Sequence, residues 1–110
     1  VNMLSRNLKL IDLQNNKIKT LPEEVADLFF LEKLKVDDNQ LKSLPSRLKE
    51  LCNLQTLTLC NNKLTDLPLG IVDLTKLEIL LLNDNKVKKL PAKIGMMHSL
   101  KKLFIHNNEF

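Results

Sequence analysis

The chain has 110 residues, enough for one small domain, and its 44% apolar share contains four Phe but no Trp or Tyr. Two glycines are too few for a glycine-rich phosphate loop, and no apolar run approaches the ~20 residues of a membrane span. The net charge of +4 permits an acidic partner without requiring one. Two cysteines do not make a disulfide framework. Unpaired thiols are typical of a reducing compartment, so we expect a cytoplasmic protein.

A repeat of 23 residues dominates the sequence. Successive units begin at Leu8, Leu31, Leu54, Leu77 and Leu100. Counted from these leucines, positions 4, 6, 11, 14, 18 and 21 are apolar, position 9 is Asn, and all four prolines fall at position 15. Residues 1–7 match the remnant of a preceding unit or a partial cap. We therefore expect one domain over residues 1–110, with about four and a half repeats, as a piece of a longer array.

The elements follow in a fixed order within each unit. Alternation at positions 4 and 6, such as Ile11 and Leu13 in the first unit, predicts a short strand in each unit. The Asn at position 9 then ends the strand, and we expect its carboxamide to bond turn backbone of its own coil and of the next coil. Leu-Pro prevents further strand pairing. The returning residues, with positions 18 and 21 inward, should form short helical or 3-10 turns, since Gly70 and Gly95 disfavour full helices.

This pattern, L-x-x-L-x-L-x-x-N-x-L-x-x-L-P-x-x-I-x-x-L-x-x, resembles the leucine-rich repeat over essentially the whole chain. It is most similar to the intracellular, 23-residue repeats of Ras-suppressor-type and polarity-scaffold proteins. The resemblance implies an α/β fold, namely a right-handed leucine-rich repeat solenoid. Its parallel sheet would form the concave face, and short helical or 3-10 turns would form the convex face.

Candidate contact residues lie at the outward positions 3, 5, 7 and 8 of the strand face, because the framework positions belong to the core. Leu81 and Phe104 share position 5 in neighbouring coils, so we expect them to touch, with Ile79 beside them on the same face. Large apolar groups gathered on a solvated face suggest an interaction site. Ten residues are the candidates for partner contact: Ile79, Leu81, Phe104, Lys33, Lys35, Thr56, Thr58, Lys102, Asn83 and His106.

A row of lysines follows the asparagine turn, at positions 10, 12 and 13. Its members are Lys17, Lys19, Lys42, Lys63, Lys86, Lys88 and Lys89. Solubility and protection of the solenoid edge explain such a row, and docking of an acidic protein or an anionic surface is the alternative. Aromatic stacking groups and nucleic-acid motifs are missing among these residues, so we expect no nucleic-acid partner.

Catalysis by the chain itself is not expected. Cys60 and His106 share position 7 but belong to coils two apart, about 9.6 Å at the usual strand spacing, which exceeds the reach of a nucleophile and its base. The same distance argues against a shared zinc ion. Adjacent acids such as Asp37 and Asp38 are usually just solvated. We therefore expect no catalytic residue, no metal, no cofactor and no small-molecule substrate.

The sequence thus predicts a protein–protein interaction module that presents a rigid concave surface, in intracellular signalling or scaffolding by resemblance. A preformed surface loses little entropy when it binds. Two alternatives stay open: a substrate-recognition segment of a larger ligase or kinase, and a purely structural part of a longer repeat array. The oligomeric state is undetermined, and no membrane insertion is expected.

Overall fold

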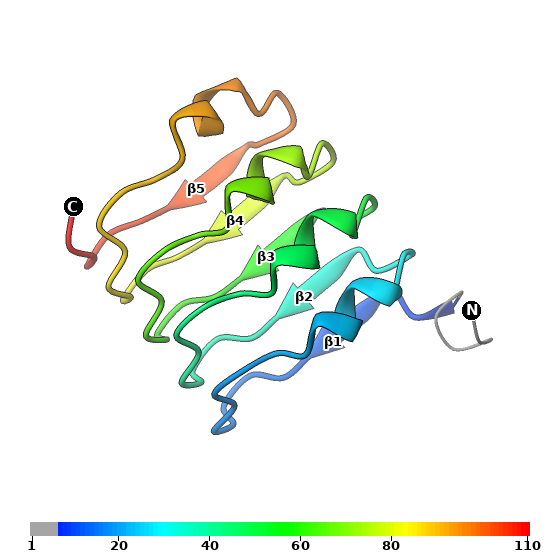
Figure 1. Cartoon of the computed structure of the whole chain (residues 1–110), viewed down its shortest axis with the longest axis horizontal. Coiled ribbons are helices and arrows are strands. Elements are labelled where there is room, and N and C mark those ends of the chain that lie inside the picture. The colour runs from blue at the N-terminus through cyan, green and yellow to red at the C-terminus, as the bar shows by residue number, and fades with distance from the viewer. Residues whose placement is uncertain (1–6) are drawn as a thin grey trace.

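The computed structural model describes residues 7–110 as a stack of coils, each with one strand and, in four of them, one 3-10 helix. Figure 1 shows the strands side by side in one sheet, with the 3-10 helices stacked over one of its faces. The elements in chain order are β1 (Leu10–Asp12), η1 (Glu23–Asp27), β2 (Lys33–Lys35), η2 (Ser46–Glu50), β3 (Thr56–Thr58), η3 (Leu69–Asp73), β4 (Ile79–Leu81), η4 (Ala92–Met96) and β5 (Lys102–Phe104). The predicted solenoid is confirmed, and its sheet is open. The expected remnant of a preceding unit falls mostly on residues 1–6, outside the described residues.

The sheet is parallel throughout, with order β1-β2-β3-β4-β5 and a constant register of one repeat. Position 4 meets position 4 in the neighbouring coil, as at Leu57 and Leu80. Ladder bonds continue past the strands, because the Leu59 N–H donates to the Leu81 carbonyl at 2.8 Å. The same repeat position therefore lies in a straight row across the sheet.

The core is built almost entirely of leucine. In the second, third and fourth coils the position-4 and position-6 residues are fully buried, and in the second and third coils the residues at positions 18 and 21 are buried as well. The equivalent residues of the first and last coils are only half-buried and pack against this cluster. Stacking therefore completes the core of each coil, as one coil alone cannot.

The position-9 asparagines join neighbouring coils. The Asn62 amide donates to its own Leu59 carbonyl at 3.1 Å and to the Val36 carbonyl at 3.0 Å, and its oxygen accepts the Leu41 N–H at 3.0 Å. Val36 and Leu41 belong to the preceding coil, so the prediction of bonding to the next coil is wrong in direction. The side chain points back along the stack, where the Val36 carbonyl accepts from both Asn39 and Asn62 and the Leu41 N–H donates to Asn62.

The convex side carries five-residue 3-10 helices, as the sequence predicts. Each is preceded by the position-15 proline as N-cap, with φ of −68° at Pro22 and −55° at Pro91. Each ends where the position-21 N–H donates to the position-18 carbonyl, as from Leu51 to Leu48 at 3.0 Å. The turn is thus too short for a full α-helix, and its residues at positions 18 and 21 point toward the core.

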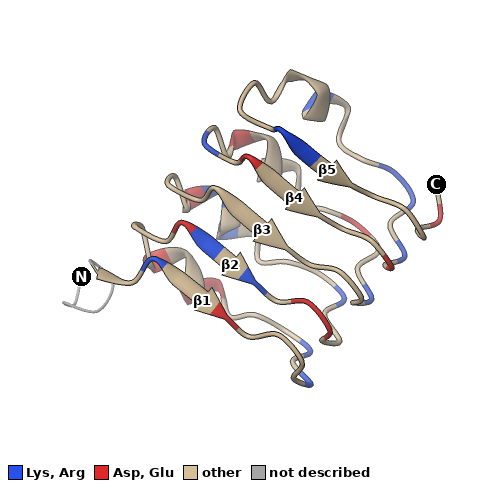
Figure 2. Ribbon diagram, turned by 180° about the vertical axis from the view of Figure 1, so that it is seen from behind, with Lys and Arg blue, Asp and Glu red and all other residues tan. Residues whose placement is uncertain are grey.

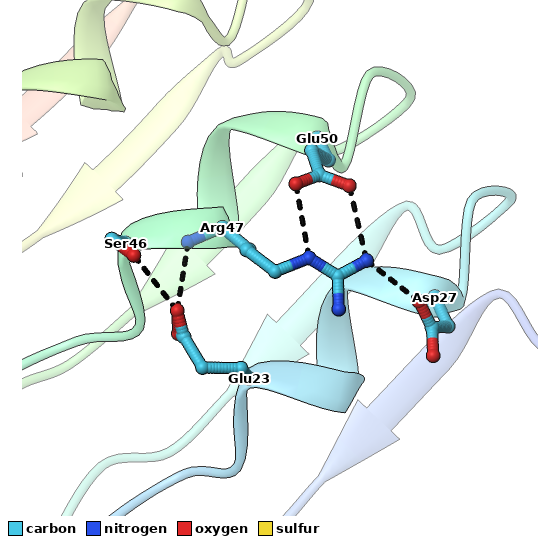
Figure 3. A network of polar contacts seen from close by, with 5 residues as sticks. All are labelled: Glu23, Asp27, Ser46, Arg47 and Glu50. Carbon is cyan, nitrogen blue, oxygen red and sulfur yellow. Dashed lines mark hydrogen bonds and ion pairs between the residues drawn. The ribbon is translucent and has the colours of Figure 1, made fainter.

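A polar network ties η1 to η2 on this convex side (Figure 3). Arg47 donates to Asp27 at 2.7 Å and to Glu50 at 3.0 and 3.1 Å. Glu23 accepts from the Ser46 hydroxyl at 2.8 Å. The hydrogen bonds from Arg47 lower the pKa of Glu50, and the two carboxylates raise the pKa of Arg47, so the guanidinium stays charged.

Candidate functional site

The sheet register brings the predicted apolar trio together on the concave face. Leu81 pairs directly with Phe104, and Ile79 lies two residues before Leu81 on the same face of β4. Phe104 is 42% exposed, while Ile79 and Leu81 are partly exposed. The trio is therefore one contiguous cluster, open to solvent at one end of the sheet, and we call it the concave apolar patch.

A lysine completes this patch. The Lys102 ammonium lies 4.8 Å from the centre of the Phe104 ring, within range of a cation–π interaction. Lys102 pairs with Ile79 in the register, so its charge borders both β4 and β5. The patch thus offers apolar contact area with a positive charge held at its margin.

The rest of the face is mostly polar, apart from Leu10 on β1. Figure 2 shows basic residues on β2 and at the start of β5, with tan ribbon on β3 and most of β4 between them. Lys33 and Lys35 both stand on β2, and Lys35 pairs with Asp12 in the neighbouring strand. Hydrogen bonds from the Gln14 amide at 3.0 Å and its N–H at 3.2 Å lower the pKa of Asp12. Thr56 links the two regions, because it pairs with Lys33 on one side and Ile79 on the other.

Thr58 is a correction to the predicted contact set. Its side chain is only 7% exposed, and its hydroxyl donates to Asp37 at 2.6 Å. The other Asp37 oxygen accepts the Cys60 N–H at 2.7 Å. Asp37 therefore folds over Thr58 and leaves it little surface for a partner. An aspartate at position 7 followed by a threonine at position 5 of the next coil is the sequence signal for this bond, and the predicted contact set did not take it into account.

Asn83 and His106 lie at position 7 of neighbouring coils, as predicted. The Asn83 side-chain oxygen accepts the His106 N–H at 3.0 Å, the same bond that Asp37 makes to Cys60. His106 is exposed, so its ring is free to meet a partner, whereas the Asn83 oxygen is already used. The side chains of Asp37 and Asn83 thus bond to the backbone of the following coil as well as facing outward.

The residue type at position 8 is determined by the conformation of the backbone there. Asn15, Asp38, Asn61, Asp84 and Asn107 all have positive φ, between 55° and 62°. Asn and Asp tolerate this left-handed region better than other non-glycine residues. Two pairs also bond across coils, Asn61 to Asp38 at 2.9 Å and Asn107 to Asp84 at 2.8 Å. Backbone conformation therefore explains why position 8, which the sequence places among the outward candidate positions, is Asn or Asp in every coil.

Cys60 and His106 follow strands that are two apart in the sheet, with β4 between them. Asn83 lies between Cys60 and His106, and its backbone and side chain bond both neighbouring coils. Partial burial raises the pKa of the Cys60 thiol, which lowers the fraction present as reactive thiolate. Within residues 7–110 no group of three or more His, Cys, Asp or Glu side chains could hold a metal ion. No helix of the described region is long and apolar enough to cross a membrane.

The comparisons with known proteins agree with this geometry. A leucine rich repeat family model matches residues 29–87 and again 52–110, and a second one matches residues 7–28. A search of curated proteins finds no match. Among solved structures, a leucine-rich repeat protein of Leptospira interrogans is similar, with a TM-score of 0.91 and 39% sequence identity. The alignment covers 93% of this chain and 26% of that protein. On the family matches and the shared fold, the chain belongs to the leucine-rich repeat family.

Proposed function

We propose that the chain binds a protein partner through its concave face, with the concave apolar patch at the centre of the contact. Leucine-rich repeat domains generally bind proteins and are generally not enzymes. The observation that supports the site is the contiguous cluster of Ile79, Leu81 and Phe104, whereas Leu10 stands alone at the other end of the face. Exposed aromatic and aliphatic groups that can be desolvated together are the usual anchors of protein interfaces.

The charges around the patch suggest the chemistry of the partner. Lys102 borders Phe104, and Lys33 and Lys35 follow along the same face. A partner segment with a large apolar side chain and flanking acidic residues would match this surface. Such charges act mainly on association rate and specificity, so raising the salt concentration should slow association.

The test compares the same charge substitution at three apolar positions of the concave face. We expect Phe104→Asp and Leu81→Asp to abolish capture of the partner by the immobilised chain, because each places a carboxylate in a desolvated contact. Leu10→Asp is the control, since Leu10 is 49% exposed at position 3 of β1 but stands alone at the other end of the sheet.

Proteins retained by the wild type and by Leu10→Asp, but lost from the two patch variants, would be identified and their affinities measured by calorimetry. Circular dichroism must show all variants folded. Equal affinity of all four chains would reject the concave patch. Failure to capture any specific protein would favour a purely structural role in a longer array.

We further propose a scaffolding or signalling role inside the cell. The two cysteines are unpaired, with Cys52 exposed and Cys60 partly buried. Free thiols are typical of proteins kept in a reducing compartment. Fractionation of cells that express the tagged chain would test the compartment, and recovery in an oxidising compartment would contradict it.

A further inference from the structure

A second surface lies along the loops that follow the strands. Figure 2 shows basic residues repeated along these loops, beyond the carboxyl ends of the strands. Three members of the lysine row, Lys19, Lys42 and Lys63, line a single hollow of about 410 Å³. The remaining lining residues are Thr20, Gln40 and Ser43. Consecutive coils therefore contribute to one site.

The lining is suited to an anion. It contains three ammonium groups, two hydroxyls and one carboxamide, and no carboxylate. None of the three lysines forms an ion pair within residues 7–110, where the ion pairs involve Arg47 and Lys101 instead. All three side chains are exposed, so their charges are available to a ligand.

Backbone hydrogen bonds hold the loops that carry these lysines side by side. The Gln40 N–H donates to the Ile18 carbonyl at 2.9 Å, and the Lys63 N–H donates to the Leu41 carbonyl at 2.8 Å. These bonds fix the loops of the first three coils in register. Lys19 and Lys42 share position 12 in adjacent coils, one strand spacing of about 4.8 Å apart along the stack. Their mutual repulsion is relieved when an anion binds between them.

We propose that this hollow binds the phosphate group of a phosphorylated side chain on a protein partner. A phosphate monoester carries a charge of about −1.5 to −2 and three acceptor oxygens, which match several lysines and hydroxyls better than the two oxygens of a carboxylate do. The hollow has room for the side chain that carries the phosphate. The nearest acid by repeat position is Asp66, at position 13 of the third coil, and it lines a different hollow with Lys89.

The same row supplies a matched control. Lys63 and Lys42 stand at positions 10 and 12, and Lys86 and Lys88 stand at the same two positions later in the chain. Neither Lys86 nor Lys88 lines the hollow. The variants Lys42→Gln/Lys63→Gln and Lys86→Gln/Lys88→Gln therefore lose equal charge from equivalent exposed positions, and only the first pair touches the proposed site.

The first measurement follows backbone amide chemical shifts of the 110-residue chain during titration with inorganic phosphate, against chloride at equal ionic strength. We expect saturable shifts centred on Lys19, Lys42, Ser43 and Lys63. The Lys42→Gln/Lys63→Gln variant should bind phosphate about tenfold more weakly, because it loses two charged donors, while the control pair should change affinity less than about twofold. Equal weakening by both pairs, or shifts spread evenly along the lysine row, would overturn the site.

The second measurement identifies the source of the phosphate. A phosphoserine peptide should bind more tightly than its unphosphorylated form, and Lys42→Gln/Lys63→Gln should remove the difference. Binding to vesicles of phosphatidylcholine with a phosphatidylinositol phosphate, without preference for the phosphopeptide, would overturn the proposal in favour of a lipid. Phe104→Asp should leave phosphate binding unchanged, so this site and the concave apolar patch can fail independently.

Discussion

At the scale of single residues, position 9 shows how one side chain joins two coils. The Asn62 side chain is almost fully buried, and it bonds to three backbone carbonyls and one backbone N–H. Asn16 occupies the same position in the first coil, but it is exposed, and among residues 7–110 it bonds to carbonyls of its own coil alone. The two asparagines therefore differ in how much backbone they satisfy.

We expect Asn62→Ala to lower the free energy of unfolding by roughly 2–4 kcal/mol, because it removes the acceptor of the buried Leu41 N–H and one of the two amide donors to each of the Val36 and Leu59 carbonyls. Asn16→Ala should cost less than about 1 kcal/mol, since water can replace its bonds. Urea denaturation of the two variants checks this. Similar costs would show that the bonds between coils contribute little.

At the scale of elements, the two glycines of the convex side differ in their surroundings. A Cβ at Gly70 in η3 would come within 2.9 Å of both Cβ and Cδ of Lys49 in η2. A Cβ at Gly95 in η4 would meet nothing within 4 Å, and neither glycine has a positive φ. Close packing of η2 on η3 therefore requires glycine at one site and not at the other.

Gly70→Ala should destabilise the chain by about 1–3 kcal/mol, because the Lys49 Cβ lies next to the backbone and cannot simply rotate away. Gly95→Ala should stabilise it by about 0.4–1 kcal/mol, since alanine restricts the unfolded chain without strain in the fold. Thermal unfolding of both variants measures the difference. A stabilised Gly70→Ala would mean that η2 and η3 separate at little cost.

The sequence predicts these elements well and their side-chain contacts less well. The 23-residue spacing predicts the parallel strands and the pairing of Leu81 with Phe104, because both depend only on register. The 3-10 turns follow from the inward positions 18 and 21 and from the glycines on the convex side. The burial of Thr58 under Asp37 and the Arg47 network depend on side-chain conformations in two coils at once. The direction of the Asn62 bonds was wrong for the same reason, since spacing alone does not say toward which neighbour a side chain points.

At the scale of the whole molecule, burial is graded along the stack. Leu57 at position 4 of the middle coil is fully buried, with a coil on each side. Leu103 at the same position of β5 pairs only with Leu80 and is half-buried. In repeat proteins each coil is stabilised by its neighbours, so the outer coils can open without the rest.

The same substitution at both positions should therefore give different results. In the 110-residue chain, Leu57→Ala should cost roughly 2–5 kcal/mol and lower the urea midpoint of the whole array, because it opens a cavity between two coils. Leu103→Ala should cost about half as much or less and mainly speed amide hydrogen exchange in β5. Equal midpoint shifts, with unchanged exchange in β5, would mean that the chain unfolds as one unit. That outcome would make the end coil that carries Phe104 as rigid as the centre, and partner binding there would then proceed on a fully preformed surface.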